Sequence, residues 1–89
     1  MIEREVVVAN RLGLHARAAA RFVHLANLYR ARISVARDSA RADGKSILGL
    51  LTLAAAKGSR LRLAADGDDA AEALDRLEAL VRGRFGEDD

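Results

Sequence analysis

The chain passes from its first strand-like segment into its first helix-like segment through Asn10-Arg11-Leu12-Gly13-Leu14-His15-Ala16-Arg17. Apolar residues recur with helical spacing after this stretch, so His15 lies where a helix begins. The first turn of a helix exposes unpaired N–H groups and the positive end of the helix dipole. A neutral imidazole, the guanidinium of Arg17 and these donors form a site for a phosphoryl group. The imidazole can act as the nucleophile while the donors neutralise the transferred charge.

A lone histidine at a helix start is more often a solvated or capping residue than a catalytic one. The neighbouring Gly13 and Arg17 favour the functional interpretation here. The second histidine, His24, lies nine positions further on, and we expect it on the surface of the same helix. Side chains nine residues apart on a helix do not face each other, so we expect no metal site between the two histidines. We predict no metal and no cofactor.

A second informative stretch is Gly44-Lys45-Ser46-Ile47-Leu48-Gly49-Leu50-Leu51-Thr52-Leu53, which opens a short helix. Serine is a preferred N-cap residue, so capping is the plainest interpretation of Ser46. The helix carries more apolar side chains than so short an element can bury. We therefore expect one or more of Ile47, Leu48 and Leu51 to stay exposed beside His15, as an apolar docking patch.

The composition indicates one small soluble domain over residues 1–89. A chain of 89 residues can bury one core. It has no cysteine, which excludes disulfides and thiolate metal sites. The charged N-terminus does not resemble a signal peptide. The longest apolar stretch, residues 47–56, is far shorter than the roughly 20 residues of a membrane helix. We predict a cytoplasmic protein without membrane insertion.

Charge and aromatic content argue against binding of nucleic acid. The 15 basic and 13 acidic residues leave a net charge of +2. A nucleic-acid module would cluster its basic residues and offer aromatic side chains for stacking. Here the arginines are scattered, and the aromatic residues are Phe22, Tyr29 and Phe85. Only residues 87–89 form a run of like charge at an end of the chain.

Hydrophobic patterning predicts seven elements in the order β-α-β-β-α-β-α. We expect strands at residues 2–8, 32–37, 40–43 and 60–66, and helices at residues 16–28, from Ser46, and after Asp69. The predicted inward-facing side chains are Ile2, Val6, Val8, Ala19, Phe22, Val23, Ala26, Ile33, Val35, Leu61, Leu63, Ala65, Ala73, Leu74, Leu77, Leu80 and Val81.

The last helix carries signals at both ends. Asp69 and Glu72 have the spacing of a capping box, and Gly83 and Gly86 are expected to fray the terminus. The two central strands are joined too tightly for a crossover helix. We therefore predict an α+β fold, in which a four-stranded, mainly antiparallel sheet carries three helices on one face.

The two quoted stretches closely resemble the active-site loop and the regulatory-serine region of the HPr family. These proteins are the histidine phosphocarriers of the bacterial phosphoenolpyruvate-dependent phosphotransferase system. The resemblance covers essentially the whole chain, with no gap between the two stretches. It implies an open-faced β-sandwich. It also implies that His15 accepts a phosphoryl group from phosphorylated enzyme I and passes it to an enzyme IIA domain.

The resemblance further implies a role for each site residue. Arg17 would stabilise the phosphoryl oxygens, and the backbone N–H groups of Ala16 and Arg17 would cradle them. Ser46 would be phosphorylated for regulation by a serine kinase/phosphorylase. The implied docking residues are Ala20, Arg21, His24, Ile47, Leu48 and Leu51. Such a protein is a stoichiometric carrier and not an enzyme, and we expect it to be a monomer.

The chain departs from the family pattern at two places. Ala18 stands where HPr proteins very often have proline, a residue favoured in the first helical turn. We therefore expect a looser loop with its chemistry retained. His24 and Asn27 stand where many relatives have basic residues, and Arg21 compensates in part. The residues at positions 24 and 27 therefore affect the affinity for partners and not the reaction itself.

Two other interpretations stay open from the sequence. One is a regulatory interaction module of the nitrogen-related or carbon-control branch. It would bind partners through the Ile47–Leu51 surface, with little role in sugar transport. Purely regulatory relatives lack the reactive histidine, so His15 counts against the extreme form of this reading. The other is a small anion- or RNA-binding domain. The motifs serve the sugar and nitrogen branches alike.

Overall fold

The computed structural model describes residues 1–88. Asp89, the end of the acidic run predicted at residues 87–89, lies outside the described residues. The elements are β1 (Ile2–Val7), α1 (Ala16–Ala26), β2 (Arg32–Arg37), β3 (Ala40–Asp43), α2 (Ile47–Leu51), β4 (Arg60–Asp66), α3 (Ala70–Arg82) and the 3₁₀ helix η1 (Arg84–Gly86). The predicted order is confirmed, with η1 added. The first strand ends one residue earlier than expected, and the first helix two residues earlier.

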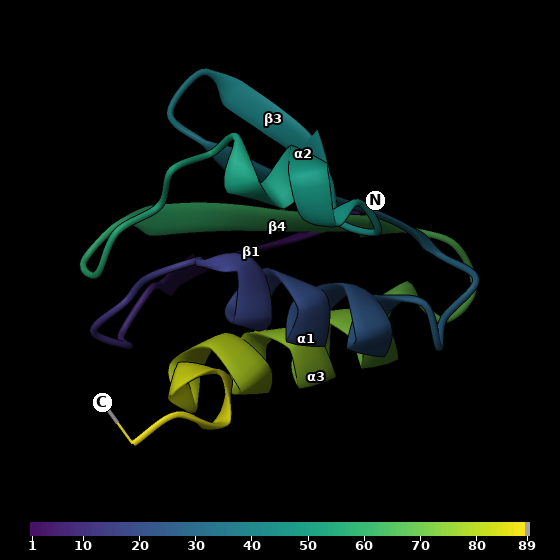
Figure 1. Cartoon of the computed structure of the whole chain (residues 1–89). Helices are drawn as coiled ribbons and strands as arrows, with labels where there is room; N and C mark the ends of the chain where they lie inside the picture. The colour runs from purple at the N-terminus through teal and green to yellow at the C-terminus, as the bar shows by residue number, and fades with distance from the viewer. Residues whose placement is uncertain (89) are drawn as a thin grey trace.

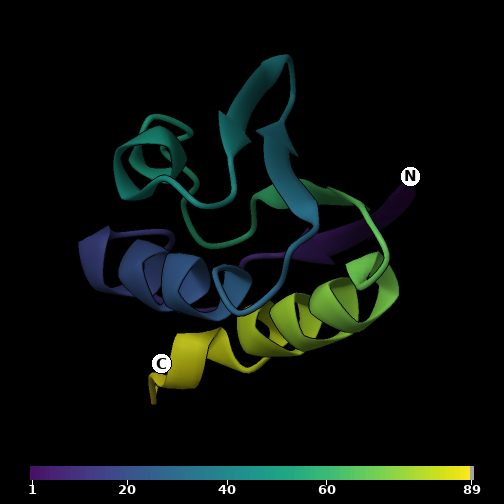
Figure 2. The same ribbon diagram turned by 90° about the vertical axis from the view of Figure 1, so that its right-hand side faces the viewer.

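The four strands form one sheet in the order β1-β4-β2-β3, and all neighbouring strands are antiparallel. Val6 pairs with Leu61, and Val35 with Leu63, so the apolar rows of adjacent strands face the same side. Figures 1 and 2 show α1 and α3 side by side across that side of the sheet, with α2 beside β3. The predicted α+β architecture is confirmed.

The core lies between the sheet and the helices. The predicted inward-facing side chains are buried there, except that Ile2 and Leu80 are half-buried and pack against its edge. Alternation in the strands places apolar side chains on the face of the sheet that the helices cover, and helical spacing in α1 and α3 places apolar side chains toward that face. No helix within residues 1–88 is long and apolar enough to cross a membrane.

The loop before α1 is fixed against the segment that follows α2. Leu14 N–H donates to the carbonyl of Ala55 at 2.8 Å. Gly13 has φ +68°, and a Cβ at this position would lie 2.5 Å from the same carbonyl oxygen. Glycine therefore permits both the left-handed backbone and the close approach. This contact sets where α1 begins and hence where His15 stands.

The capping box predicted at Asp69 and Glu72 is wrong. Asp69 is the N-cap residue of α3, but its side chain makes no capping hydrogen bond. Its carboxylate instead accepts the backbone N–H groups of Arg30 and Ala31, each at 2.9 Å. The hydrogen bond from Arg30 is the main cause of a lowered pKa of Asp69. Asp69 therefore ties the α1–β2 loop to the start of α3, a long-range role that local spacing did not indicate.

The prediction of a frayed C-terminus is also wrong. After Gly83 the chain turns into η1, and the side chain of Phe85 is fully buried in the core. Arg84 and Phe85 adopt φ of 60° and 54°, a conformation unusual for side-chain-bearing residues. A guanidinium N–H of Arg21 in α1 donates to the Phe85 carbonyl. Burial of an aromatic ring and this hydrogen bond hold the segment against α1.

Candidate functional site

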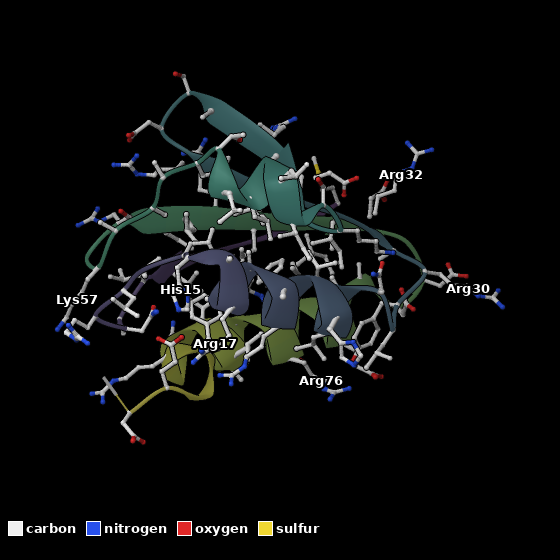
Figure 3. The ribbon with its side chains drawn as sticks, in the orientation of Figure 1. His15, Arg17, Arg30, Arg32, Lys57 and Arg76 are labelled. Atoms are coloured by element: carbon white, nitrogen blue, oxygen red, sulfur yellow. The ribbon has the colours of Figure 1, made fainter. Side chains whose placement is uncertain are left out.

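His15 is the N-cap residue of α1, as the sequence predicts for the helix boundary. Its backbone is extended, with φ −81° and ψ −179°. Its Nδ1 accepts the backbone N–H of Arg17 at 3.3 Å. The side chain is 25% exposed, so the ring is held by its surroundings while one edge stays accessible. Figure 3 shows His15 and Arg17 close together at the start of α1.

The other ring nitrogen meets a residue that the sequence analysis missed. Nε2 of His15 lies 2.5 Å from Oε2 of Glu87, whose Oε1 accepts a hydrogen bond from the Asn10 side chain at 3.0 Å. The hydrogen bonds from Asn10 and His15 hold the pKa of the Glu87 carboxyl below its usual value. Glu87 comes to this place because the buried Phe85 folds the chain end back across α1. The sequence feature that could have indicated this fold-back is Phe85, an apolar aromatic residue between Gly83 and Gly86.

These contacts define the protonation of the imidazole. An ionised carboxylate only accepts hydrogen bonds, so Nε2 carries the proton that it shares with Glu87. Nδ1 accepts the Arg17 N–H, which requires an unprotonated nitrogen with its lone pair toward the start of α1. The two contacts together favour the tautomer with its proton on Nε2, in which Nδ1 is the nitrogen that can act as a nucleophile.

Asn10, the first residue of the opening stretch, is a polar residue that is fully buried. Its side-chain amide donates to the Gly13 carbonyl at 2.7 Å and to Glu87. Its Oδ1 is buried without a hydrogen-bond partner within residues 1–88. The Asn10 amide thus links the loop before His15 to the Glu87 carboxylate. Asn10 and His15 both contact this one carboxylate.

Arg17 lies where an incoming anion can meet it. Its side chain is exposed and lines a hollow of about 210 Å³ together with Arg11, Leu12, Glu87 and Asp88. The N–H groups of Ala16 and Arg17 belong to the first turn of α1, which has no preceding helical carbonyls to bind. The structure therefore brings together the three groups that the sequence predicts at this place, namely the His15 imidazole, the Arg17 guanidinium and the helix-start donors.

The second predicted cluster lies on α2 and the facing side of α1. Ser46 caps α2 by accepting the Gly49 N–H at 3.0 Å, which confirms the capping interpretation. Leu48 is 77% exposed and Ile47 is 40% exposed, whereas Leu51 is half-buried. Ala20, Arg21 and His24 are exposed along α1. Leu12, which the sequence analysis did not select, adds a 58% exposed apolar side chain.

The two ends of α2 lie at different distances from His15. Lys45 donates through Nζ to the Tyr29 carbonyl, beyond the end of α1. The segment after α2 contacts Leu14, just before α1. The two helices therefore run in opposite directions, with Ser46 toward the far end of α1. That helix has 11 residues, a length of about 16 Å.

Two departures from the family pattern can now be placed. Ala18 is fully buried in the first turn of α1, which forms without proline at this position. His24 and Asn27 are exposed at the C-terminal part of α1. Within residues 1–88, no three His, Cys, Asp or Glu side chains gather closely enough to hold a metal ion.

Comparison with known proteins places the chain among phosphocarriers. A family model described as the PTS HPr component phosphorylation site matches residues 2–83. The phosphocarrier protein HPr of Neisseria meningitidis serogroup A is 44% identical over 87 residues, covering 98% of each chain. The phosphocarrier protein NPr of Shewanella violacea is 42% identical over 86 residues, covering 97% of this chain and 94% of that protein.

Solved structures show the same relationship. The crystal structure of HPr-C-His from Thermoanaerobacter tengcongensis has a TM-score of 0.94 and 39% identity, covering 99% of each chain. The catabolite repression protein Crh of Bacillus subtilis, crystallised as a swapped dimer, has a TM-score of 0.76 and 38% identity, covering 94% of this chain and 97% of that one. Because sequence and structure match over nearly the full length, the chain belongs to the HPr family of phosphotransferase-system phosphocarriers.

Proposed function

We propose that this protein carries a phosphoryl group on Nδ1 of His15, from phosphorylated enzyme I to an enzyme IIA domain. The observation that supports this most strongly is the geometry around the imidazole. Nε2 lies 2.5 Å from Oε2 of Glu87, and Nδ1 accepts the Arg17 N–H at the start of α1. A nucleophile, a helix start and an exposed guanidinium meet at one accessible point, as phosphoryl transfer requires.

Nδ1 of His15 forms a bond to phosphorus while the bond from phosphorus to the donor histidine breaks, and that histidine leaves with the electron pair. The His15 ring keeps its Nε2 proton. The Arg17 N–H, which donates to Nδ1 in the free protein, can turn to a phosphoryl oxygen. The Arg17 guanidinium neutralises charge on the remaining oxygens.

The protein would act as a stoichiometric carrier, because the phosphoryl group is accepted and given away at the same atom. It is then a co-substrate of two transferases and turns nothing over alone. We place it in the cytoplasm as one domain over residues 1–89, and as a monomer. Crh and one HPr of Thermoanaerobacter tengcongensis are dimers in solved structures, so molar mass in solution decides the last point.

The partner surface would be the exposed apolar part of α2 and the adjoining side of α1. Ile47, Leu48 and Leu51 supply apolar contact, and Ala20 lets a partner approach α1 closely. Arg21 and His24 add polar contacts, and Leu12 offers a further exposed apolar side chain at the hollow that Arg17 and Glu87 line. Neighbouring exposed apolar side chains, here Ile47 and Leu48, support a surface that another protein covers.

Ser46 would be the regulatory site, phosphorylated by a serine kinase/phosphorylase. A phosphate at the Ser46 cap would add roughly −1.5 to −2 charges at neutral pH to the edge of the docking surface. Since Ser46 lies toward the far end of α1, the effect would fall on partner binding rather than on the imidazole.

A regulatory protein of the nitrogen-related or carbon-control branch is the second candidate. It is favoured by the likeness to the proteins named NPr and catabolite repression HPr, together with the exposed Ile47–Leu51 surface. Gene neighbourhood separates the branches. Sugar permease genes indicate uptake, whereas a serine kinase gene with a lone enzyme IIA gene indicates regulation.

The proposed function is tested by incubation with phosphoenolpyruvate and enzyme I, followed by intact-mass measurement. A gain of one phosphate supports the carrier, and transfer to an enzyme IIA domain completes the cycle. A protein that binds enzyme I without gaining phosphate is instead the regulatory module.

A further inference from the structure

The C-terminal segment forms part of the wall of the His15 site. Phe85 anchors it in the core, and Arg21 holds the Phe85 carbonyl. Two residues later, Glu87 contacts both Asn10 and His15. The Glu87 side chain is only 14% exposed although it lies near the chain end. A carboxylate held from several sides has a defined position relative to the ring.

Glu87 and Arg17 act on opposite nitrogens of the same imidazole. The Glu87 carboxylate accepts from Nε2, and the Arg17 N–H donates to Nδ1. Either contact alone selects the tautomer with its proton on Nε2, and together they also set the orientation of the ring. The same logic fixes the histidine of a Ser-His-Asp triad, where a carboxylate holds the tautomer and stabilises the imidazolium that forms.

We propose that Glu87 is a positioning residue for phosphoryl transfer. It holds the proton on Nε2, keeps Nδ1 unprotonated and stabilises the charge that develops on the ring. This inference rests on the proposed function of His15. As Nδ1 bonds to phosphorus, a ring that keeps its Nε2 proton gains positive charge. The adjacent carboxylate stabilises that charge both when His15 accepts the phosphoryl group and when it gives the group away, because the ring carries the charge in each of the two transition states.

Asn10 determines which oxygen of the Glu87 carboxylate faces His15. Its amide donates to Oε1 of Glu87, which leaves Oε2 for His15. Two N–H donors thus converge on two carboxylate oxygens. A glutamine at position 87 offers one oxygen and one NH₂ group, and so can satisfy only one of the two donors. If its oxygen stays with Asn10, its NH₂ group faces His15 and favours the wrong tautomer.

The test compares Glu87→Gln with Glu72→Gln. The second variant removes the same charge from an exposed residue of α3 and is the control. Phosphorylation of His15 by enzyme I is measured under single-turnover conditions. ¹⁵N NMR of the two imidazole nitrogens reports the tautomer in the same samples. We expect Glu87→Gln to transfer about tenfold more slowly and to lose the pure Nε2–H signature. Glu72→Gln should match the wild type in both measurements.

A second variant at position 87, Glu87→Ala, keeps the Phe85 anchor and removes the carboxylate without creating a new chain end. It should show the same two changes with an unaltered circular dichroism spectrum. Wild-type rates and an unchanged ¹⁵N signature in both variants would overturn the inference while leaving the carrier function intact. A wild-type protein that takes no phosphate would instead contradict the proposed function, and the inference with it.

Discussion

Leu14 donates its backbone N–H to the Ala55 carbonyl at 2.8 Å, which joins the start of α1 to the segment after α2. This one bond connects the two regions that the sequence marks as functional. His15 follows Leu14 directly, and the exposed side chains of α2 precede Ala55 by a few residues. His15 and the proposed docking surface therefore keep a fixed relation.

Gly13→Ala tests that connection. The new Cβ would lie 2.5 Å from the Ala55 carbonyl oxygen, and alanine would have to adopt the left-handed backbone of this position. We expect a loss of about 2–4 kcal/mol in the free energy of unfolding, from strain and overpacking together. Urea denaturation measures it. Gly58→Ala is the control, because Gly58 also has positive φ but nothing within 4 Å of its Cβ position. Equal losses at the two sites would show that the contact with Ala55 is unimportant.

Arg17→Ala should slow phosphoryl transfer without affecting the fold. The side chain is exposed, so the free energy of unfolding should change by no more than about 0.5 kcal/mol. Loss of a charge-assisted contact should raise the activation free energy by about 2 kcal/mol, roughly 30-fold in rate. Arg32→Ala, at the opposite end of the molecule in Figure 3, is the matched control. Identical transfer rates for the two variants would remove Arg17 from the site.

Ser46→Asp should leave the circular dichroism spectrum unchanged and slow phosphorylation of His15. Negative charge is tolerated at a helix start, but it adds repulsion and desolvation for an acidic or apolar partner. The defect should be partly relieved by salt. Ser39→Asp places the same charge in the exposed β2–β3 turn. The regulatory role fails if Ser46→Asp and authentically phosphorylated protein both react at the wild-type rate.

Asp69→Asn should destabilise the protein at neutral pH by an amount that disappears in acid. The pKa of Asp69 is lowered from 3.8, chiefly by the N–H of Arg30. A carboxyl with a depressed folded-state pKa stabilises above its unfolded value, and this contribution is lost as pH falls through the folded value. Denaturation midpoints of wild type and variant should therefore differ at pH 7 and converge below the folded-state pKa. Asp68→Asn, exposed next to it, controls for net charge. A difference that is constant with pH would contradict the assignment.

Local patterns predict much of this fold and part of its site. Alternation placed Val6, Leu61 and Leu63 in the core, and the tight β2–β3 joint excluded a parallel sheet. The helix boundary at His15 followed from short-range spacing. These features depend on neighbouring residues, so a single sequence contains them.

The missed features depend on contacts between residues far apart in the chain. Glu87 lies 72 positions from His15, and Asp69 lies 39 positions from Arg30. Asp69 had the right local spacing for a capping box, but two backbone donors from another loop bind its carboxylate instead. Gly83 and Gly86 suggested a frayed end. The burial of Phe85 between them could not be predicted, because it depends on the shape of the finished core.

The most direct test of the central claim is to locate the phosphoryl group after reaction with phosphoenolpyruvate and enzyme I. We expect one phosphate on His15, bound as a phosphoramidate that is labile to acid and comparatively stable to alkali. At the end point of the reaction, His24→Ala should carry one phosphate and His15→Ala should carry none. Phosphate that persists in His15→Ala would contradict the assignment of His15 as the carrier residue.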